Sequence, residues 1–125
     1  MEAIARGDVA AALALYNDDA VLQGGLLCTA APCVGKGAIQ KELERRVARK
    51  DRATIIRKYV SGNVAAIQLE LRTDAIQKAG VDRIIIWGIY EVKGDKIAYA
   101  TTVPQRTDPQ TARFLEWQRS QPPAR

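Results

Sequence analysis

The stretch IIIWGIYEVKGDKIAYA, residues 84–100, holds two runs rich in β-branched and aromatic residues, separated by the turn sequence Lys93-Gly94-Asp95. Two such runs joined by a short turn predict an antiparallel hairpin. Side chains of a strand point alternately to its two faces, and in the first run both faces are apolar. One face holds Ile84, Ile86 and Tyr90, and the other holds Ile85, Trp87 and Ile89. A strand of this kind must be covered on both sides.

Similar runs continue on either side of this hairpin. The turn signals around Gly62 and Gly80 separate strands that we expect at about 54–61, 64–74, 82–92 and 96–103. Such short connections favour a four-stranded antiparallel meander. The run 64–74 alternates between an apolar face and a polar face, and the polar face carries Gln68, Glu70, Arg72 and Asp74.

Helical patterns precede and follow the predicted meander. Asp8 is expected to cap a first helix with an apolar face from Val9 to Tyr16, closed by the polar run 17–19 and followed by a short strand at 20–23. A second amphipathic helix is expected over 38–50, where Ile39, Leu43 and Val47 recur every four residues. Asp108 and Pro109 predict the start of a short C-terminal helix at about 108–120.

Length and composition indicate one soluble globular domain over residues 1–125. The chain has 125 residues, of which 47% are hydrophobic and 26% charged. No apolar run approaches the roughly 20 residues that cross a bilayer, so we expect no membrane partner. The opening MEAIARGD lacks the basic and then apolar pattern of a signal peptide, which makes the cytoplasm the expected location.

The net charge of +5 raises the question of nucleic-acid binding. The densest basic segment, KELERRVARKDR at 41–52, also contains three acidic residues and no aromatic residue that could stack on bases. This composition favours a solvated helix face, and we expect no nucleic-acid partner.

The two cysteines, Cys28 and Cys33, lie in the sequence CTAAPC. Across so tight a loop they could form a disulfide, or they could remain free thiols in a reducing compartment. A structural zinc site usually needs four cysteine or histidine ligands, and the chain has two cysteines and no histidine. We therefore expect no metal site and no cofactor.

The order of helix, short strand, loop, helix and curved meander resembles the nuclear transport factor 2-like superfamily, also called SnoaL-like. ARGDVAAALALYNDDAVL at 5–22, CVGKGAIQKEL at 33–43 and residues 84–100 carry this resemblance. It implies an α+β cone, in which a curved antiparallel sheet wraps on helices as a cystatin-like α+β barrel. The superfamily includes isomerases, dehydratases, cyclases, epoxide hydrolases and proteins without a known reaction, so fold alone names no activity.

Within that superfamily, ELRTD at 70–74 is similar to the Arg-x-Asp pair of limonene-epoxide-hydrolase-like enzymes. The resemblance makes Arg72 and Asp74 the candidate catalytic residues. Those enzymes use a second aspartate to activate water, and the matching position here holds Thr102. The other interpretation of Arg72 and Asp74 is a polar outer face of the sheet with cross-strand ion pairs.

Other mechanisms of the superfamily are excluded by missing residues. Ketosteroid isomerases need two carboxyl groups at positions that fall near Gly24 and at Gly88. Polyketide cyclases and scytalone-type dehydratases of the superfamily use histidine for proton transfer, and the chain contains no histidine. The candidate pocket residues are Tyr16, Ile84, Ile86, Tyr90 and Thr102.

Two functions remain open. One is binding of a small apolar ligand in the cone without catalysis, which the missing catalytic groups favour. The other is a cofactor-independent enzyme of the epoxide hydrolase, isomerase or cyclase type that uses Asp74 and Arg72. Because residues 84–92 are apolar on both faces, we also expect a homodimer through the sheet.

Overall fold

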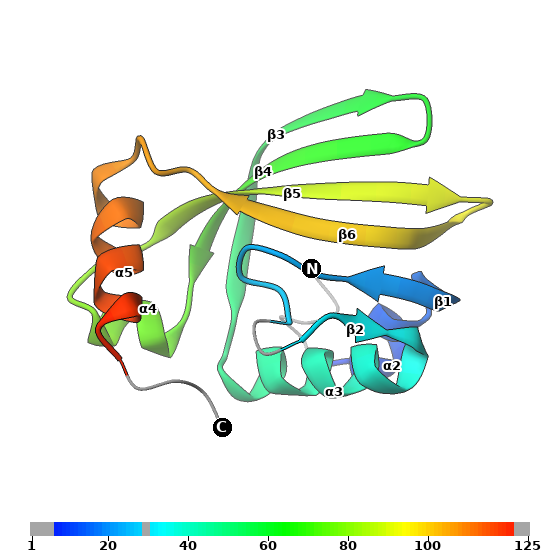
Figure 1. The fold of residues 1–125 in the computed structure, drawn as a ribbon, viewed down its shortest axis with the longest axis horizontal. Helices are drawn as coiled ribbons and strands as arrows, with labels where there is room; N and C mark the ends of the chain where they lie inside the picture. The colour runs from blue at the N-terminus through cyan, green and yellow to red at the C-terminus, as the bar shows by residue number, and fades with distance from the viewer. Residues whose placement is uncertain (1–6, 29–30, 122–125) are drawn as a thin grey trace.

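The computed structural model describes residues 7–28 and 31–121, which form six strands and four helices. The strands are β1 (Tyr16–Leu22), β2 (Cys33–Val34), β3 (Arg52–Ser61), β4 (Val64–Arg72), β5 (Ile84–Lys93) and β6 (Lys96–Pro104). They form one sheet in the order β2-β1-β6-β5-β4-β3, shown in Figure 1. The predicted antiparallel meander is confirmed for β3 to β6, and β1 joins it by parallel pairing with β6.

The helices are α2 (Val9–Leu13), α3 (Gly35–Ala48), α4 (Asp74–Lys78) and α5 (Pro109–Arg119). Figure 1 shows the sheet curving over α2 and α3 at one end and toward α4 and α5 at the other. This confirms the α+β fold class and the curved sheet. None of the helices in the described ranges is long and apolar enough to cross a membrane.

The first helix is shorter than the sequence predicted. It ends at Leu13, and the polar run 17–19 lies inside β1 instead of closing a helix. The amide of Ile97 donates to the carbonyl oxygen of Leu15, and Tyr16 pairs with Ile97. Pairing with β6 therefore outweighs the local helical pattern, because helix propensity is a weak preference that tertiary contacts override.

The strand predicted at 64–74 ends two residues early, at Arg72. Thr73 instead caps α4, since its hydroxyl oxygen accepts from the amide of Ile76 at 3.1 Å. Thr, at the N-cap position, satisfies an amide that the first turn of a helix leaves without a partner. Asp74 therefore belongs to a helix and not to the sheet.

The core of the described residues consists of two apolar clusters. One joins α2, α3 and β1 around Leu22, Ile39 and Leu43, and the other joins α4, α5, β4 and β5 around Ile76 and Ile84. Asp108 anchors α5 by accepting from the amide of Thr111 at 3.0 Å and from its hydroxyl at 2.8 Å. The space between the two clusters contains the candidate site.

Candidate functional site

A cavity of about 200 Å³ lies between the inner face of the sheet, the loop before β2, and helices α3, α4 and α5. Its wall is mostly apolar and includes Leu26, Leu27, Leu69, Leu71, Ile76, Ile84, Ile86 and Phe114. Seven polar residues also line it: Arg46, Arg49, Asp51, Thr73, Tyr90, Thr102 and Gln118. An apolar wall with few polar groups is typical of small-molecule sites.

Four of the five predicted pocket residues line this cavity. Ile84, Ile86 and Tyr90 reach it from β5 and Thr102 from β6. Tyr16 does not line it, but is buried in the neighbouring apolar cluster, against which Tyr90 packs. That any of these residues binds a ligand stays a prediction.

The candidate catalytic residues Arg72 and Asp74 do not enter this cavity, and a catalytic role for them stays a prediction. Both residues are exposed and neither lines the cavity. Arg72 lies on the polar face of β4, where it forms an ion pair with Glu70 and donates to the carbonyl oxygen of Asp82 at 3.2 Å. Thr73, on the opposite phase, is the member of this segment that faces the cavity. The alternation of β4 thus sends Arg72 outward, and Asp74 begins α4.

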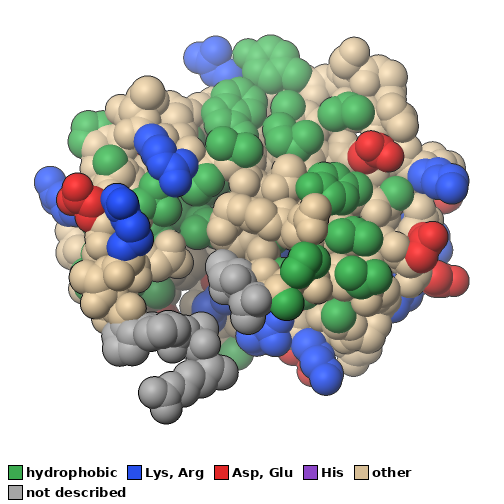
Figure 2. Space-filling view, in the orientation of Figure 1, with side chains coloured by type: hydrophobic (Ala, Val, Ile, Leu, Met, Phe, Trp, Pro, Cys, Tyr) green, Lys and Arg blue, Asp and Glu red, His purple; other side chains and the backbone are tan. Residues whose placement is uncertain are grey.

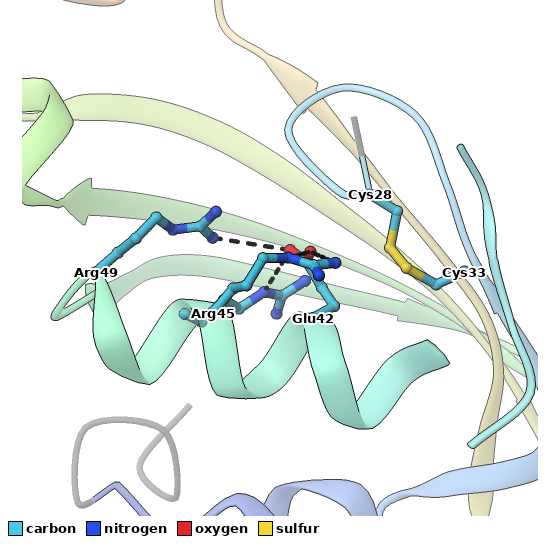
Figure 3. Close-up of a disulfide and its surroundings, with 6 residues drawn as sticks. Cys28, Cys33, Glu42, Arg45 and Arg49 are labelled. Atoms are coloured by element: carbon cyan, nitrogen blue, oxygen red, sulfur yellow. Dashed lines mark hydrogen bonds and ion pairs between the residues drawn. A yellow bond between two sulfur atoms is a disulfide. The ribbon is translucent and has the colours of Figure 1, made fainter. Parts of the chain in front are cut away.

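The charged side chains that do reach the cavity come from α3 and from the segment that follows it. Glu42 is buried, with 4% of its side chain exposed, and accepts from Arg45 Nε at 3.1 Å and Nη2 at 2.8 Å. Its other carboxylate oxygen lies 3.5 Å from Arg46 Nε and 3.7 Å from Arg49 Nη2. Figure 3 shows Arg45 and Arg49 reaching toward the Glu42 carboxylate. One buried carboxylate thus holds Arg46 and Arg49 beside the cavity.

Asp51 is the carboxyl group that lines the cavity within the described part of the chain. Its oxygens accept from Arg49 Nε at 3.4 Å and Nη2 at 3.3 Å, and its side chain is 11% exposed. Burial raises the pKa of Asp51 above its usual value, and this outweighs the opposing effect of Arg49 and Arg46. Burial therefore favours the protonated form of Asp51 more than water would.

Two tyrosines form the buried side of this polar region. Burial raises the pKa of Tyr16 and of Tyr90, and the nearby charge of Arg46 opposes the shift at both. The ring of Tyr90 lies over Gly88 of the same strand. A Cβ at Gly88 would lie 2.8 Å from Cε2 of Tyr90, so a glycine is what allows the ring to lie there.

Thr102 supports the cavity wall. Its hydroxyl accepts a hydrogen bond from the amide of Leu26 at 2.7 Å and donates one to the carbonyl oxygen of Gly24 at 3.3 Å. Both hydrogen-bonding roles are thereby used within the protein. Thr102 fixes the loop that carries Leu26 and Leu27, and it does not offer a free base to a ligand.

The cysteines are joined in this structure as the disulfide Cys28–Cys33, with 5.8 Å between their Cα atoms. The bond closes the loop directly after the cavity residue Leu27 (Figure 3). The sulfurs and a Glu42 carboxylate oxygen lie within 4.8 Å of one another. Thiolates are the form of cysteine that binds metals, so this trio could act as ligands only after reduction.

The position of Arg46 in the sequence already indicates that it is partly buried. Arg46 lies seven residues after Ile39 and three after Leu43, which places it on the buried stripe of the helix rather than on the solvated face. Glu42, at i−4 from Arg46, lies on the same side and is buried. A charged residue at such a position is paired inside the protein or belongs to a site.

The comparisons with known proteins establish the family. The family model described as SnoaL-like domain matches residues 1–100. The curated proteins include no match. Solved structures with the same fold include the epoxide hydrolase/cyclase-like enzyme SalBIII of salinomycin pyran formation, 14% identical with a TM-score of 0.71 over 86% of this chain and 85% of that chain.

Two further similar structures support the same fold. An LEH-like epoxide hydrolase of M. tuberculosis is 18% identical, with a TM-score of 0.65 over 92% of this chain and 83% of that chain. An NTF2-like protein of unknown function from Cytophaga hutchinsonii is 13% identical, with a TM-score of 0.67 over 85% and 83%. Likeness at this level of identity concerns the fold. Since the family match spans most of the sequence, the chain belongs to the SnoaL-like domain family.

Proposed function

We propose that this protein binds a small, largely apolar molecule in the cavity between its curved sheet and helices α3, α4 and α5. The observation that carries this proposal is the cavity itself, with a mostly apolar wall and a minority of polar side chains. Burial of ligand surface against such a wall supplies most of the affinity, while the polar groups set orientation. The cavity volume is about 200 Å³. The ligand is correspondingly small.

A cavity-filling substitution tests this proposal. Ala53 lines the cavity from β3, whereas Ala48 is exposed near the end of α3. Ala53→Leu should lower the affinity for small aromatic ligands at least tenfold, and the matched variant Ala48→Leu should leave it unchanged. Isothermal titration calorimetry with a panel of phenyl-bearing compounds measures both. The proposal is refuted by a wild-type protein that binds no member of the panel at millimolar concentration, or by equal affinities in the two variants.

A catalytic function is the second candidate, and Asp51 is the observation that favours it. A carboxyl group with a raised pKa, held by Arg49 beside an apolar cavity, can protonate an epoxide oxygen while water attacks the adjacent carbon. The attacking water then returns one proton to Asp51, so that the net reaction is hydration of the epoxide to a diol. Epoxides are chosen because two structures of this fold are named for epoxide hydrolase chemistry.

Turnover of styrene oxide by the wild type, followed by chromatography of the diol, tests this second candidate. Asp51→Asn should abolish the reaction, whereas Asp74→Asn on exposed α4 should leave it intact. Equal turnover in Asp51→Asn and the wild type would exclude Asp51 as the acid. The binding proposal does not depend on this result.

We also propose that two copies associate through the outer face of the sheet. Tyr59 and Val103 on this face are 56% and 50% exposed, and Tyr59 stacks on Trp87 with ring centroids 6.1 Å apart. Figure 2 shows hydrophobic side chains gathered over the strands. Contiguous exposed apolar surface on a sheet favours association. Sedimentation should give a dimer at micromolar concentration and a monomer for Val103→Lys; a monomeric wild type would refute the proposal.

A further inference from the structure

We propose that the cavity selects a ligand with one carboxylate group, which binds at the guanidinium groups of Arg46 and Arg49. This inference rests on the proposed binding function and names the chemical class of the ligand. It follows from the balance of charges around the cavity, from the hydrogen bonding of Arg46, and from the size and lining of the cavity.

The charges beside the cavity do not cancel. Arg45, Arg46 and Arg49 all lie within 4 Å of Glu42, and Arg49 also contacts Asp51. Three guanidinium groups face two carboxyl groups, so at least one positive charge is in excess. Since Arg45 does not line the cavity and is 55% exposed, water can solvate it. Arg46 and Arg49 do line the cavity, and the excess charge concerns mainly Arg46, because Arg49 is 44% exposed.

Arg46 has the weaker carboxylate contacts of these two, and it also interacts with the Tyr16 side chain. The Arg46 side chain is 19% exposed, and its closest contact to a carboxylate is the 3.5 Å separation between Nε and Glu42. Its Nη2 atom is buried and has no hydrogen-bond acceptor within the part of the chain that the structure describes. A buried donor of a charged group without an acceptor is costly, and such groups are normally paired. Because Arg46 lines the cavity, an acceptor on a ligand placed there could pair with its guanidinium group.

A carboxylate matches this arrangement best. It accepts hydrogen bonds only, through two oxygens, and it pairs with a guanidinium by two parallel bonds. A single negative charge offsets one of the excess positive charges. A phosphate ester would bring nearly two negative charges into a cavity of about 200 Å³ whose wall is mostly apolar. A cationic ligand would be repelled by Arg46 and Arg49.

The experiment compares two ligands of one shape, 3-phenylpropanoate and 3-phenylpropanamide, by isothermal titration calorimetry at pH 7. The acid should bind about 10- to 100-fold more tightly than the amide, which is the gain expected from a hydrogen bond to a charged group. Arg46→Gln should bring the affinity of the acid close to that of the amide. Arg49→Gln provides a second variant, should Arg46→Gln not fold. Arg72→Gln, on the outer face, should keep the full preference for the acid.

The outcomes separate the inference from the function on which it rests. If the acid and the amide bind the wild type equally, or the amide binds more tightly, the carboxylate inference is overturned and the binding function stands. If neither ligand binds, both fail. If the preference for the acid survives in both Arg46→Gln and Arg49→Gln, the carboxylate binds elsewhere and the inference is overturned as well.

Discussion

Replacing Glu42 by glutamine removes the negative charge that holds three arginines beside the cavity. The side chain is 4% exposed, so the structure gives it no water to compensate the change. Breaking a buried ion pair by removing one partner costs about 3–5 kcal/mol. Arg45 and Arg49 are 55% and 44% exposed and can be rehydrated, which leaves mainly Arg46 uncompensated. We therefore expect a loss near the lower end, about 3 kcal/mol.

Urea denaturation followed by circular dichroism measures this loss, because urea, unlike guanidinium chloride, does not screen charges. The midpoint should fall while the slope stays constant, and the melting temperature should fall by about 10 °C. Glu44→Gln is the matched control, since Glu44 is exposed on the same helix. It should change stability by no more than about 0.5 kcal/mol. Equal stability of the two variants would refute the assignment of Glu42 as the anchor of the arginines.

Three further predictions concern other residues. Asp108→Ala should cost about 2 kcal/mol in urea unfolding, because the cap of α5 and the 2.7 Å contact to Arg83 are lost. Burial alone would raise the pKa of Asp108, but hydrogen bonds from Thr111 and Arg83 outweigh this effect and lower it. The stability that Asp108 contributes is therefore present above its unfolded pKa and is lost as pH falls through the folded pKa. A loss of stability in Asp108→Ala that does not depend on pH would contradict this. The pKa of Asp51 is instead raised in the folded protein, so deprotonating it lowers the free energy of unfolding. In urea titrations at several pH values, the stability of the wild type should fall relative to that of Asp51→Asn as pH rises from about 4. Gly88→Ala should displace the Tyr90 ring, costing about 1–3 kcal/mol and weakening ligand binding; unchanged affinity by calorimetry would refute that placement.

The sequence was informative where alternation and turns agree. The strand β5 is apolar in both phases and lies within the meander. The turn at Gly62 closes the β3–β4 hairpin and the turn at Gly94 closes the β5–β6 hairpin, with positive φ angles of 57° and 68°. Those glycines adopt a conformation that other residues avoid, which makes such turns readable from sequence. The inner phase of β5 also predicted Ile84, Ile86 and Tyr90 on one face, and these residues line the cavity.

The candidate site could not be predicted in the same way. Arg72 points outward from the end of β4, and Asp74 lies in α4, because Thr73 ends the strand by capping that helix. Arg46 and Arg49 lie in a basic segment whose composition predicts a solvent-exposed helix face, so composition alone gives no sign of their place at the cavity. Whether such charges are buried depends on the elements that pack against α3, and this is tertiary information. Helix periodicity alone could have drawn attention to Glu42 and Arg46.

The central claim, that the cavity is a ligand site, can be tested by NMR with isoleucine δ1-methyl labels during titration with 3-phenylpropanoate. Ile76, Ile84 and Ile86 line the cavity, whereas Ile85 and Ile89 lie on the opposite phase of β5. The claim predicts saturable shifts of the first three methyl signals, with those of Ile85 and Ile89 nearly unmoved. Shifts confined to Ile85 and Ile89, or no saturable shift at all, would contradict it.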